Sequence, residues 1–413
     1  MSKEEKRVPE VRFEGFYDDW KQRKLSELMT FSNGINAPKE NYGKGRKMIS
    51  VMDILQEAPI KYENIRSSVK VDEKIEVKNK VENGDLVFVR SSEVREEVGW
   101  AKAYLEEKYA LYSGFSIRGK KQNEFNSHFI ELTLNSVNRK QLERKAGGST
   151  RFNVSQNILN NVEIFSPTIE EQNTIDKLFK VFNDAITLHQ EKLSKLQSLK
   201  KAALQSLFPQ KDETEPKVRF ANFKSKWSQR QLGETLIERN IQQTQSIEYP
   251  LVSFTVQDGV TPKTERYNRQ QLVRGSKKDK KYKVTEFNDI VYNPANLKFG
   301  AIARNKYGKA VLSPIYVTFR VNQEIVYPSY IEMTVTNPDF IKYSLRYQQG
   351  TVYERQSVNP EDLLSLYISI PEKEEQSDIG LFFEQLNNDV ELYKSKLEKL
   401  QRLKKSFLQR MFI

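Results

Sequence analysis

The chain is predicted to be a mixed α/β (α+β) protein: two globular domains separated by a long antiparallel two-helix coiled coil, related by an internal pseudo-twofold repeat. Three observations support this fold class. Two sequence blocks recur about 200 residues apart, strand-forming runs fill the variable stretches between them, and a long helical pattern follows each stretch. A repeat of this length exceeds the roughly 20–50 residues of solenoid units, so it indicates duplication of a whole domain with its helix.

The first repeated block opens each half of the chain. Ten residues of the segment 9–27 recur without a gap in 216–234, shifted by 207 residues. The second block begins with Pro-x-x-Glu-Glu-Gln at residue 167 and recurs at residue 371, together with much of the helical segment that follows. Because a duplicated chain carries two related copies of each surface, we expect two related binding surfaces.

Between the repeated blocks lie two variable stretches, called here head 1 (residues 21–165) and head 2 (residues 228–369). Runs of β-branched and aromatic residues predict strands in both. The expected strands are 85–89, 112–117 and 129–134 in head 1 and 289–292, 311–321 and 366–370 in head 2. A few identities survive between the heads, including Asp85/Asp289, Ser113/Ser313 and Arg151/Arg355. The heads are therefore expected to share a scaffold and to differ in surface.

Each head is followed by the pattern of a long amphipathic helix. Apolar residues recur at helical spacing through 170–208 and 374–411, and neither Pro nor Gly interrupts the first of these segments. Pro167 and Pro371 suit a helix entrance, and the glutamates after them favour the positive end of the helix dipole. Three to four heptads predict a coiled coil in which the two copies pair. At 1.5 Å per residue, each helix would span roughly 58 Å.

The composition excludes several classes of protein. A net charge of +12 favours a polyanionic partner, with nucleic acid first, and a merely soluble basic protein is the alternative. The chain has no cysteine and only two histidines, which excludes disulfides, thiolate metal sites and histidine-rich metal sites. The N-terminus has no apolar signal, and no run approaches the roughly 20 apolar residues of a membrane span. We therefore expect a soluble, cytoplasmic protein with no metal and no membrane contact.

No catalytic centre is expected in this chain. The segment Asn293-Pro294-Ala295-Asn296 superficially resembles the Asp/Asn-Pro-Pro-aromatic loop of adenine methyltransferases. It lacks the second proline and the aromatic residue that would stack on a flipped base, and it is better interpreted as a turn after a strand ending at Tyr292. The sequence contains no Walker-type phosphate loop, and Pro338-Asp339 lacks the downstream residues of a nuclease motif.

The ordered set of motifs resembles the specificity (S) subunit of type I restriction–modification enzymes. The matching features are Val-Arg-Phe followed by Phe and Trp (11–20 and 218–227), the Gly/Asn-Asp-hydrophobic-Val strand (84–87 and 288–291), and Pro-x-x-x-Glu-Gln with its long helix (167–208 and 371–412). The resemblance covers essentially the whole chain. Each motif alone is weak, but the ordered set occurs twice, which makes it specific.

The resemblance implies a non-catalytic subunit that reads an asymmetric, bipartite target in double-stranded DNA, with one half-site per head. In that family the paired helices act as a ruler and dock two methyltransferase (modification) subunits, and two restriction (motor–nuclease) subunits join the complex. S-adenosylmethionine, ATP and Mg are then expected on those partner subunits and not in this chain. The implied segments are target recognition domain 1 (1–165), a central helix (166–208), a linker (209–216), target recognition domain 2 (217–369) and a C-terminal helix (370–413).

The residues expected to contact DNA are basic side chains for phosphates and basic or small polar side chains for base edges. In head 1 the candidates are Lys44, Arg46, Lys47, Arg90, Ser91, Ser92, Arg118, Lys120, Lys121, Ser149, Thr150 and Arg151. In head 2 they are Arg274, Lys277, Lys278, Lys280, Lys281, Asn293, Asn296, Lys298, Arg304, Arg355 and Gln356. The alternative for each candidate is a side chain that is merely solvated at the surface. For the shared pair Arg151/Arg355, a role in holding the fold is a second alternative.

Two other functions fit parts of the sequence. An autonomous DNA-binding regulator with two heads would need no methyltransferase, so co-purification with such a partner separates it from the first interpretation. A structural coiled-coil protein would show no salt-dependent DNA affinity, and it leaves the difference between the heads unexplained.

Overall fold

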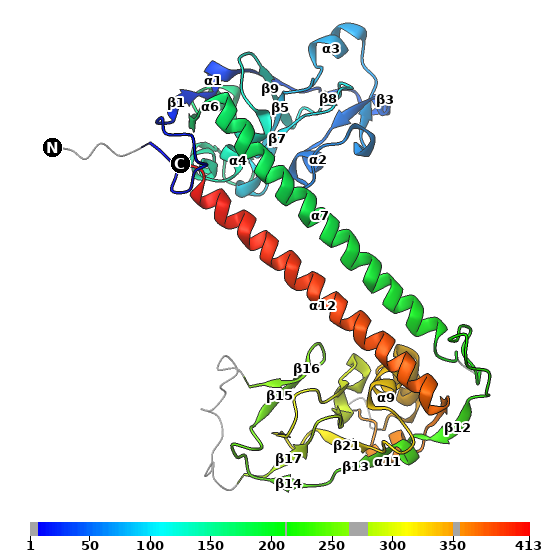
Figure 1. The fold of residues 1–413 in the computed structure, drawn as a ribbon. Helices are drawn as coiled ribbons and strands as arrows, with labels where there is room; N and C mark the ends of the chain where they lie inside the picture. Colours follow the sequence, from blue (N-terminus) through cyan, green and yellow to red (C-terminus); the bar gives the residue numbers. More distant parts are fainter. Residues whose placement is uncertain (1–6, 211–212, 264–279, 350–355) are drawn as a thin grey trace, which may run out of the picture. The chain divides into compact units, whose positions relative to one another are not determined.

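The structure, a computed structural model, describes residues 7–210, 213–263, 280–349 and 356–413. The chain forms two compact units, and each is described here by itself. Unit 1 contains residues 1–189 together with 396–413, and unit 2 contains residues 190–395. Each unit therefore includes one head, part of the helix that follows it and part of the helix that follows the other head (Figure 1).

Head 1 is built on a four-stranded antiparallel sheet with the strand order β2-β9-β5-β7. A second sheet has the order β4-β3-β8, and two strand pairs, β1-β11 and β6-β10, complete the head. The strands are β1 Lys21–Lys24, β2 Met29–Asn33, β3 Tyr42–Ile49, β4 Ser68–Val69, β5 Leu86–Val89, β6 Ser91–Ser92, β7 Ala101–Ala103, β8 Leu111–Tyr112, β9 Ser116–Lys121, β10 Phe152–Asn153 and β11 Glu163–Ser166. The short helices are α1 Leu25–Leu28, α2 Val51–Leu55, α3 Glu73–Lys78, α4 Ser127–Asn135, α5 Arg139–Lys145 and α6 Gln156–Asn160.

Head 2 repeats the four-stranded sheet and the pair formed by the first and last strands of the head. Its four-stranded antiparallel sheet has the order β13-β21-β18-β19, with β14-β17-β20 as the second sheet and β12-β22 and β15-β16 as pairs. The strands are β12 Ser228–Gln231, β13 Leu236–Glu238, β14 Gln242–Gln243, β15 Val252–Thr255, β16 Gly259–Pro262, β17 Tyr282–Thr285, β18 Ile290–Tyr292, β19 Ile302–Arg304, β20 Ala310–Leu312, β21 Val317–Val321 and β22 Tyr367–Ile370. The short helices are α8 Leu232–Thr235, α9 Pro328–Val335, α10 Pro338–Ser344 and α11 Pro360–Leu364.

The expected strands 85–89, 289–292 and 366–370 are confirmed, 112–117 and 311–321 each cover parts of two strands joined by a turn, and one expected strand is wrong. Residues 129–134 lie in helix α4 and not in a strand. Asn126 caps this helix, because its side chain accepts a hydrogen bond of 2.9 Å from the Phe129 amide. A short apolar run is ambiguous between a strand and a buried helix, and here the N-cap and the packing of both helix faces select the helix.

The two long helices confirm the helical prediction and the mixed α/β class. Helix α7 covers Ile169–Ser206 and helix α12 covers Lys373–Arg410. Each begins two residues after the proline that was expected at its entrance, and each has two glutamates in its first turn. No helix in the described part of the chain is both long and apolar enough to cross a membrane.

The core of unit 1 contains an aromatic cluster that joins both ends of the chain. Trp20, Phe129 and Phe179 pack around Phe412, with ring centroids 5.4–6.4 Å apart from the Phe412 ring. Phe182 of α7 lies 5.6 Å from Phe407 of α12. As residue numbers rise along α7, the contacted residue numbers fall along α12. The two helix segments in unit 1 are therefore antiparallel.

The core of unit 2 contains the matching cluster. Phe208, at the end of the first helical segment, lies 5.7 Å from Tyr330 and 6.0 Å from Phe383. Trp227 lies 6.2 Å from Tyr330 with its ring edge-on. Phe208 and Phe412 are equivalent residues of the two repeats. Each head therefore receives this phenylalanine from the end of the helix that follows the other head.

Candidate nucleic-acid interface

The two repeated blocks meet in unit 1 at a buried carboxylate. Arg12 donates two hydrogen bonds to Glu171, of 2.7 and 2.8 Å, and the Trp20 indole donates a third of 3.4 Å. The Glu171 side chain is only 1% exposed. The hydrogen bonds to Glu171 raise the pKa of Arg12 above its usual range, as a partly buried ion pair does. We call this group of three residues the clasp of unit 1.

Unit 2 has the same clasp at the equivalent positions. Arg219 donates hydrogen bonds of 2.9 and 2.6 Å to Glu375, and the Trp227 indole donates one of 3.2 Å. The repeated Arg, Trp and Glu therefore hold the beginning of each head against the start of its long helix. This explains their recurrence by structure, without any contact to a ligand.

The glutamine that follows each clasp glutamate binds the segment that precedes another helix of the head, α4 in head 1 and α9 in head 2. Gln172 accepts a hydrogen bond of 2.9 Å from the Asn126 amide and donates one of 3.0 Å to the Pro167 carbonyl. Gln376 makes the equivalent bonds, at 2.9 and 3.0 Å, with the Tyr327 amide and the Pro371 carbonyl. Asn126 and Tyr327 precede α4 and α9, so the long helix fixes the position of the helix that covers each sheet.

A buried aspartate at the beginning of a central strand is the other shared anchor. Asp85 accepts a hydrogen bond of 2.7 Å from Arg118, and Asp289 accepts one of 2.8 Å from Arg239. Each aspartate also accepts a hydrogen bond of 2.8 Å from the backbone amide three residues before it, which belongs to Glu82 in head 1 and to Glu286 in head 2. The arginine comes from a different place in each head, since Arg118 lies in β9 and Arg239 directly follows β13, although the carboxylate is the same. These contacts fix the sheet on which the variable loops stand.

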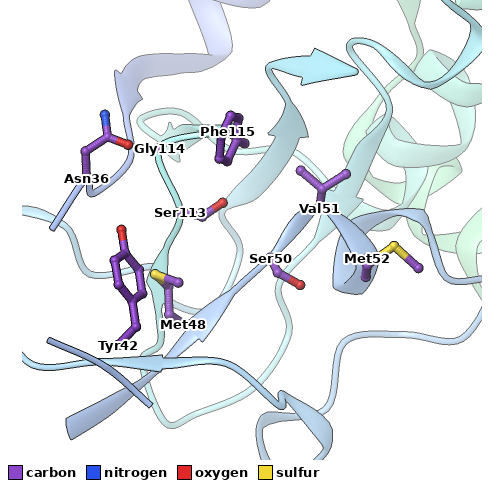
Figure 2. A pocket seen from close by; sticks show the side chains of 9 residues that line it. All are labelled: Asn36, Tyr42, Met48, Ser50, Val51, Met52, Ser113, Gly114 and Phe115. Carbon is purple, nitrogen blue, oxygen red and sulfur yellow. The ribbon is translucent and has the colours of Figure 1, made fainter. Parts of the chain in front are cut away.

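The loops at one edge of head 1 form a hollow of about 350 Å³, shown in Figure 2. We call it the Phe115 hollow, and it is lined by Asn36, Tyr42, Met48, Ser50, Val51, Met52, Ser113, Gly114 and Phe115. Backbone hydrogen bonds of 2.9 and 2.8 Å, from Ile35 to Tyr112 and from Gly114 to Ile35, hold two of these loops together. A Cβ atom on Gly34 would lie 2.1 Å from the Ser113 carbonyl oxygen, so this close approach requires glycine.

A second hollow, of about 380 Å³, adjoins the first and shares Val51 and Phe115 with it. It brings together Ser91, Ser92 and Arg151, which were predicted from separate parts of the sequence. The strands β6 and β10 cause this juxtaposition, because Ser92 pairs with Phe152 in their register. The Arg151 guanidinium lies 5.6 Å from the centre of the Phe115 ring. Glu93 and Glu97 also line this hollow, and Ser92 donates a hydrogen bond of 2.6 Å to Glu97.

The other surface candidates of head 1 differ in how free their side chains are. Arg46 is held by Glu76 and Tyr109, at 3.1 and 2.8 Å, and Lys47 donates to the carbonyls of Glu63 and Ile65. Arg90 donates a long bond of 3.3 Å to the Gly114 carbonyl, and Lys121 donates one of 2.7 Å to the Phe125 carbonyl. Lys44, Lys120, Ser149 and Thr150 are exposed to solvent.

Several candidates of head 2 lie outside the described residues, namely Arg274, Lys277, Lys278 and Arg355. Of the described ones, Lys280, Lys281, Lys298 and Gln356 are exposed, and Asn296 is half-buried. Lys298 lies 5.2 Å from the ring centre of Phe299, which is 65% exposed. A basic and an aromatic side chain therefore share this part of the surface, as Arg151 and Phe115 do in head 1.

Three candidates are buried and engaged with partners inside the protein. Arg118 is 4% exposed and pairs with Asp85 and Glu82. Arg304 is 9% exposed and pairs with Glu332 and Glu384. Asn293 is 6% exposed and accepts a hydrogen bond of 3.1 Å from the Ala295 amide. Their partners are internal, so these side chains maintain the fold.

The Asn293 contact also confirms that this segment is a turn. The strand β18 ends at Tyr292, and a 3₁₀-helix follows at Pro294–Phe299 with Asn293 as its cap. Within the described residues, no group of three or more His, Asp or Glu side chains is arranged to hold a metal ion.

Known proteins share both the sequence pattern and this architecture. The profile of the type I restriction modification DNA specificity domain matches residues 17–198. A crystal structure of the type I restriction–modification S subunit from M. genitalium matches with a TM-score of 0.61 and 13% identity, covering 98% of this chain and 99% of that one. A chain from a structural study of complex assembly and conformational transition of the type I R-M system gives a TM-score of 0.50 at 15% identity, covering 95% and 97%. Residues 17–198 are therefore similar to this specificity domain, and the chain as a whole shares the fold of those S subunits.

Sequence reasoning missed part of the surface of head 1. Phe115 is 52% exposed and Met52 is 75% exposed, and neither was a candidate because phosphate and base-edge chemistry favours basic and small polar residues. One feature of the sequence could have pointed to Phe115. Ser113 and Ser313 match between the heads, and two residues beyond them lie Phe115 and Ile315, of which Ile315 is 57% exposed. The same loop therefore presents a different apolar tip in each head.

Each long helix carries a pair of adjacent lysines near its end, Lys200-Lys201 on α7 and Lys404-Lys405 on α12. Burial lowers the pKa of Lys200 and of Lys404. Lys404 faces Glu131 and Lys102 in unit 1, and Lys200 faces Glu332 in unit 2. The neighbouring Lys201 and Lys405 are exposed. One lysine of each pair therefore packs against a head.

Proposed function

We propose that this chain is the DNA sequence-recognition subunit of a type I restriction–modification complex. It reads an asymmetric bipartite target in double-stranded DNA, with one half-site for each head, and has no catalytic centre of its own. It docks two methyltransferase subunits and two restriction subunits, which bind S-adenosylmethionine, ATP and Mg. The complex acts in the cytoplasm.

The observation that carries this proposal is a common scaffold with unlike surfaces. The four-stranded sheets have equivalent strand orders, and the same arginine, tryptophan and glutamate side chains form both clasps. The loop tips differ, with Phe115 in head 1 and Ile315 in head 2. Because base readout depends on side chains at the protein surface, two unlike surfaces on one scaffold favour two different half-sites.

Exposed leucines on the long helices support the docking of two copies of one partner. Leu188 and Leu199 of α7 are 64% and 49% exposed, and their equivalents Leu392 and Leu403 of α12 are 48% and 41% exposed. Eleven residues separate the two leucines on each helix, close to three full turns, so they lie on one face. An exposed apolar face marks a protein interface, and its repetition suits two identical partners.

Exchange of one head tests the recognition part of the proposal. Residues 21–165 are replaced by the head of a related specificity subunit, and methylated adenines are mapped by sequencing in a host that carries the partner genes. We expect one half-site to change, while the other half-site and the spacing stay the same. The reciprocal exchange of residues 228–369 is the matched control and should change only the other half-site. A change in both half-sites after one exchange would overturn the modular interpretation.

Charge substitutions on the helices test the docking part. Leu188→Glu with Leu392→Glu should reduce co-purification of the methyltransferase subunit several-fold, because a carboxylate is costly in an apolar contact. Gln197→Glu with Gln401→Glu is the control, since it adds the same charge at equivalent, exposed positions about half a turn away from the leucine face. Equal retention of the partner by both variants would assign docking to another surface. A chain that binds DNA with no methyltransferase partner at all would instead be the autonomous regulator.

A further inference from the structure

The Phe115 hollow combines an apolar wall with one free amide. Phe115 and Met52 are 52% and 75% exposed, and Val51 lies beside them. In Figure 2, Asn36 and Tyr42 lie on one side of the hollow, and Val51 and Met52 lie on the other. Large apolar side chains left open to water in one cluster indicate a surface that a ligand covers.

The amide is that of Asn36. It has no hydrogen-bond partner among the described residues, and it lies against the backbone of Gly114. A Cβ atom on Gly114 would be 1.9 Å from the Asn36 Oδ1 atom, so glycine at this position leaves the space that the amide occupies. The neighbouring Tyr42 hydroxyl accepts a hydrogen bond of 3.0 Å from the Ala37 amide and so holds the loop that carries Asn36. Asn36 is thus exposed to solvent on a loop that the Tyr42 bond holds, and its amide group offers both a donor and an acceptor.

The surroundings of the hollow favour a polyanion. The Arg151 side chain is 54% exposed and lies over the Phe115 ring, while its distance to Glu93 is a loose 3.9 Å. Arg90 reaches the Gly114 carbonyl at the same loop. The whole chain carries a net charge of +12. Arginines at the rim provide phosphate contacts, and the amide and apolar wall between them are left for base edges.

We propose that the Phe115 hollow reads one A·T base pair of the half-site recognised by head 1. Phe115, with Val51 and Met52, contacts the 5-methyl group of thymine. The Asn36 amide bonds N6 and N7 of the adenine. This inference rests on the proposed function and adds the base pair that one surface of head 1 selects.

The chemistry of the major groove leads to this choice. Thymine alone presents a methyl group there, and apolar side chains contact it, whereas asparagine donates to N7 and accepts from N6 of adenine. Guanine offers acceptors at both O6 and N7, which suit an arginine or lysine and leave the oxygen of an asparagine amide unpaired. The hollow itself is lined by no lysine or arginine among the described residues. An apolar wall beside an amide therefore matches A·T better than G·C.

Removal of the thymine methyl group tests the apolar contact. The full chain, purified with its methyltransferase partner, first selects its target from a random duplex library, and the head exchange identifies the half-site of head 1. Each thymine of that half-site is then replaced singly by deoxyuridine. We expect one position at which the wild type loses about fourfold in affinity, the effect of one buried methyl group. Phe115→Ala should show no loss at that position.

Ile315→Ala is the matched control, because it truncates the equivalent apolar tip in head 2. It should keep the discrimination between thymine and uracil in the half-site of head 1. The same loss with uracil in wild type and in Phe115→Ala would overturn the proposal. Absence of any thymine with a sensitive methyl group would overturn it as well. If Phe115→Ala weakened all sequences equally, Phe115 would stack without reading a base, and the proposal would again be wrong.

Gly114→Ala tests the amide independently. The added methyl group displaces the Asn36 amide without changing any charge, and the backbone of Gly114 is not in the left-handed region. We expect preference for A·T over G·C at the sensitive position to fall about tenfold in this variant and in Asn36→Ala, as for loss of a bidentate pair. Unchanged preference in both variants would overturn the role of Asn36. A wild-type complex that selects no sequence at all would instead contradict the proposed function itself.

Discussion

Arg12 and Glu171 are 159 residues apart in the chain and form a doubly hydrogen-bonded ion pair in unit 1. The guanidinium is 14% exposed and the carboxylate 1% exposed. Arg219 and Glu375 form the same pair in unit 2, 156 residues apart. A two-point contact of this kind joins the first segment of each head to the helix that leaves it, so it fixes the direction of the helix as well as its distance.

Loss of the clasp arginine should destabilise one unit selectively. In Arg12→Ala the buried Glu171 keeps only the weak indole bond, and removal of one partner from a buried ion pair costs roughly 3–5 kcal/mol. We expect faster amide hydrogen exchange in residues 21–165 and no change in residues 228–369. Arg219→Ala is the mirror control and should change only the second head. Equal loss of protection in both heads after either substitution would contradict the independence of the clasps.

The C-terminal phenylalanine should stabilise the first head. Phe412 is 3% exposed and packs on Trp20, Phe129 and Phe179. Phe412→Ala leaves a cavity in unit 1 and should lower the free energy of its unfolding by about 3–5 kcal/mol. Urea denaturation followed by hydrogen exchange at the peptide level would measure this for each unit. Phe208→Ala is the equivalent change in unit 2 and serves as the control. If Phe412→Ala destabilised unit 2 instead of unit 1, Phe412 would not belong to the core of unit 1.

Unit 1 should lose stability at acid pH through Asp176. Burial opposes ionisation of this carboxylate, but hydrogen bonds from His128, Lys180 and Asn126 outweigh burial and lower the pKa of Asp176 to about 2. An aspartate has a pKa near 3.9 when unfolded, so its contribution is complete above about pH 4 and is lost as the pH falls to about 2. The contribution should be about 1–2 kcal/mol, and Asp176→Asn should remove this part of the pH dependence.

The second repeat offers an internal control for this titration. Gly380 and Ser329 occupy the positions of Asp176 and His128, and a Cβ atom on Gly380 would lie 2.2 Å from the Ser329 Oγ atom. Close packing replaces the hydrogen-bonded pair there, so unit 2 has no carboxylate at this position. Unfolding of each unit, followed between pH 2 and pH 4, should show the difference. A pH profile of unit 1 that is identical in wild type and Asp176→Asn would refute the prediction.

The basic segment of head 2 should contribute to DNA affinity regardless of sequence. Lys277, Lys278, Lys280 and Lys281 were predicted to contact phosphates, and only the last two lie within the described residues. Replacement of all four by alanine should weaken binding to every sequence and reduce the slope of log affinity against log salt, by about 0.9 for each phosphate that is no longer neutralised. Binding titrations at several salt concentrations measure the slope. An unchanged slope would assign these lysines to solvent or to a protein partner.

The sequence alone determined the duplication, the two long helices and the family resemblance. These follow from local signals: helical periodicity, helix entrances and repeated blocks that need no knowledge of distant contacts. It also indicated that Asp85 and Asp289 belong to a shared scaffold. It failed at residues 129–134, because a short apolar run fits a strand or a buried helix equally well until a cap and a packing partner are known.

Only the tertiary structure decided what the repeated polar residues do. Glu171 follows a helix entrance in the sequence, and its burial beneath Arg12 and Trp20 depends on a segment more than 150 residues away. Arg118 and Lys120 are near neighbours in the same strand, yet the first is buried against the Asp85 carboxylate and the second is exposed to solvent. The loops that bring Asn36 beside Gly114 are likewise joined by long-range backbone hydrogen bonds. Charge and residue type indicate what could bind DNA, and packing decides which of those side chains face it.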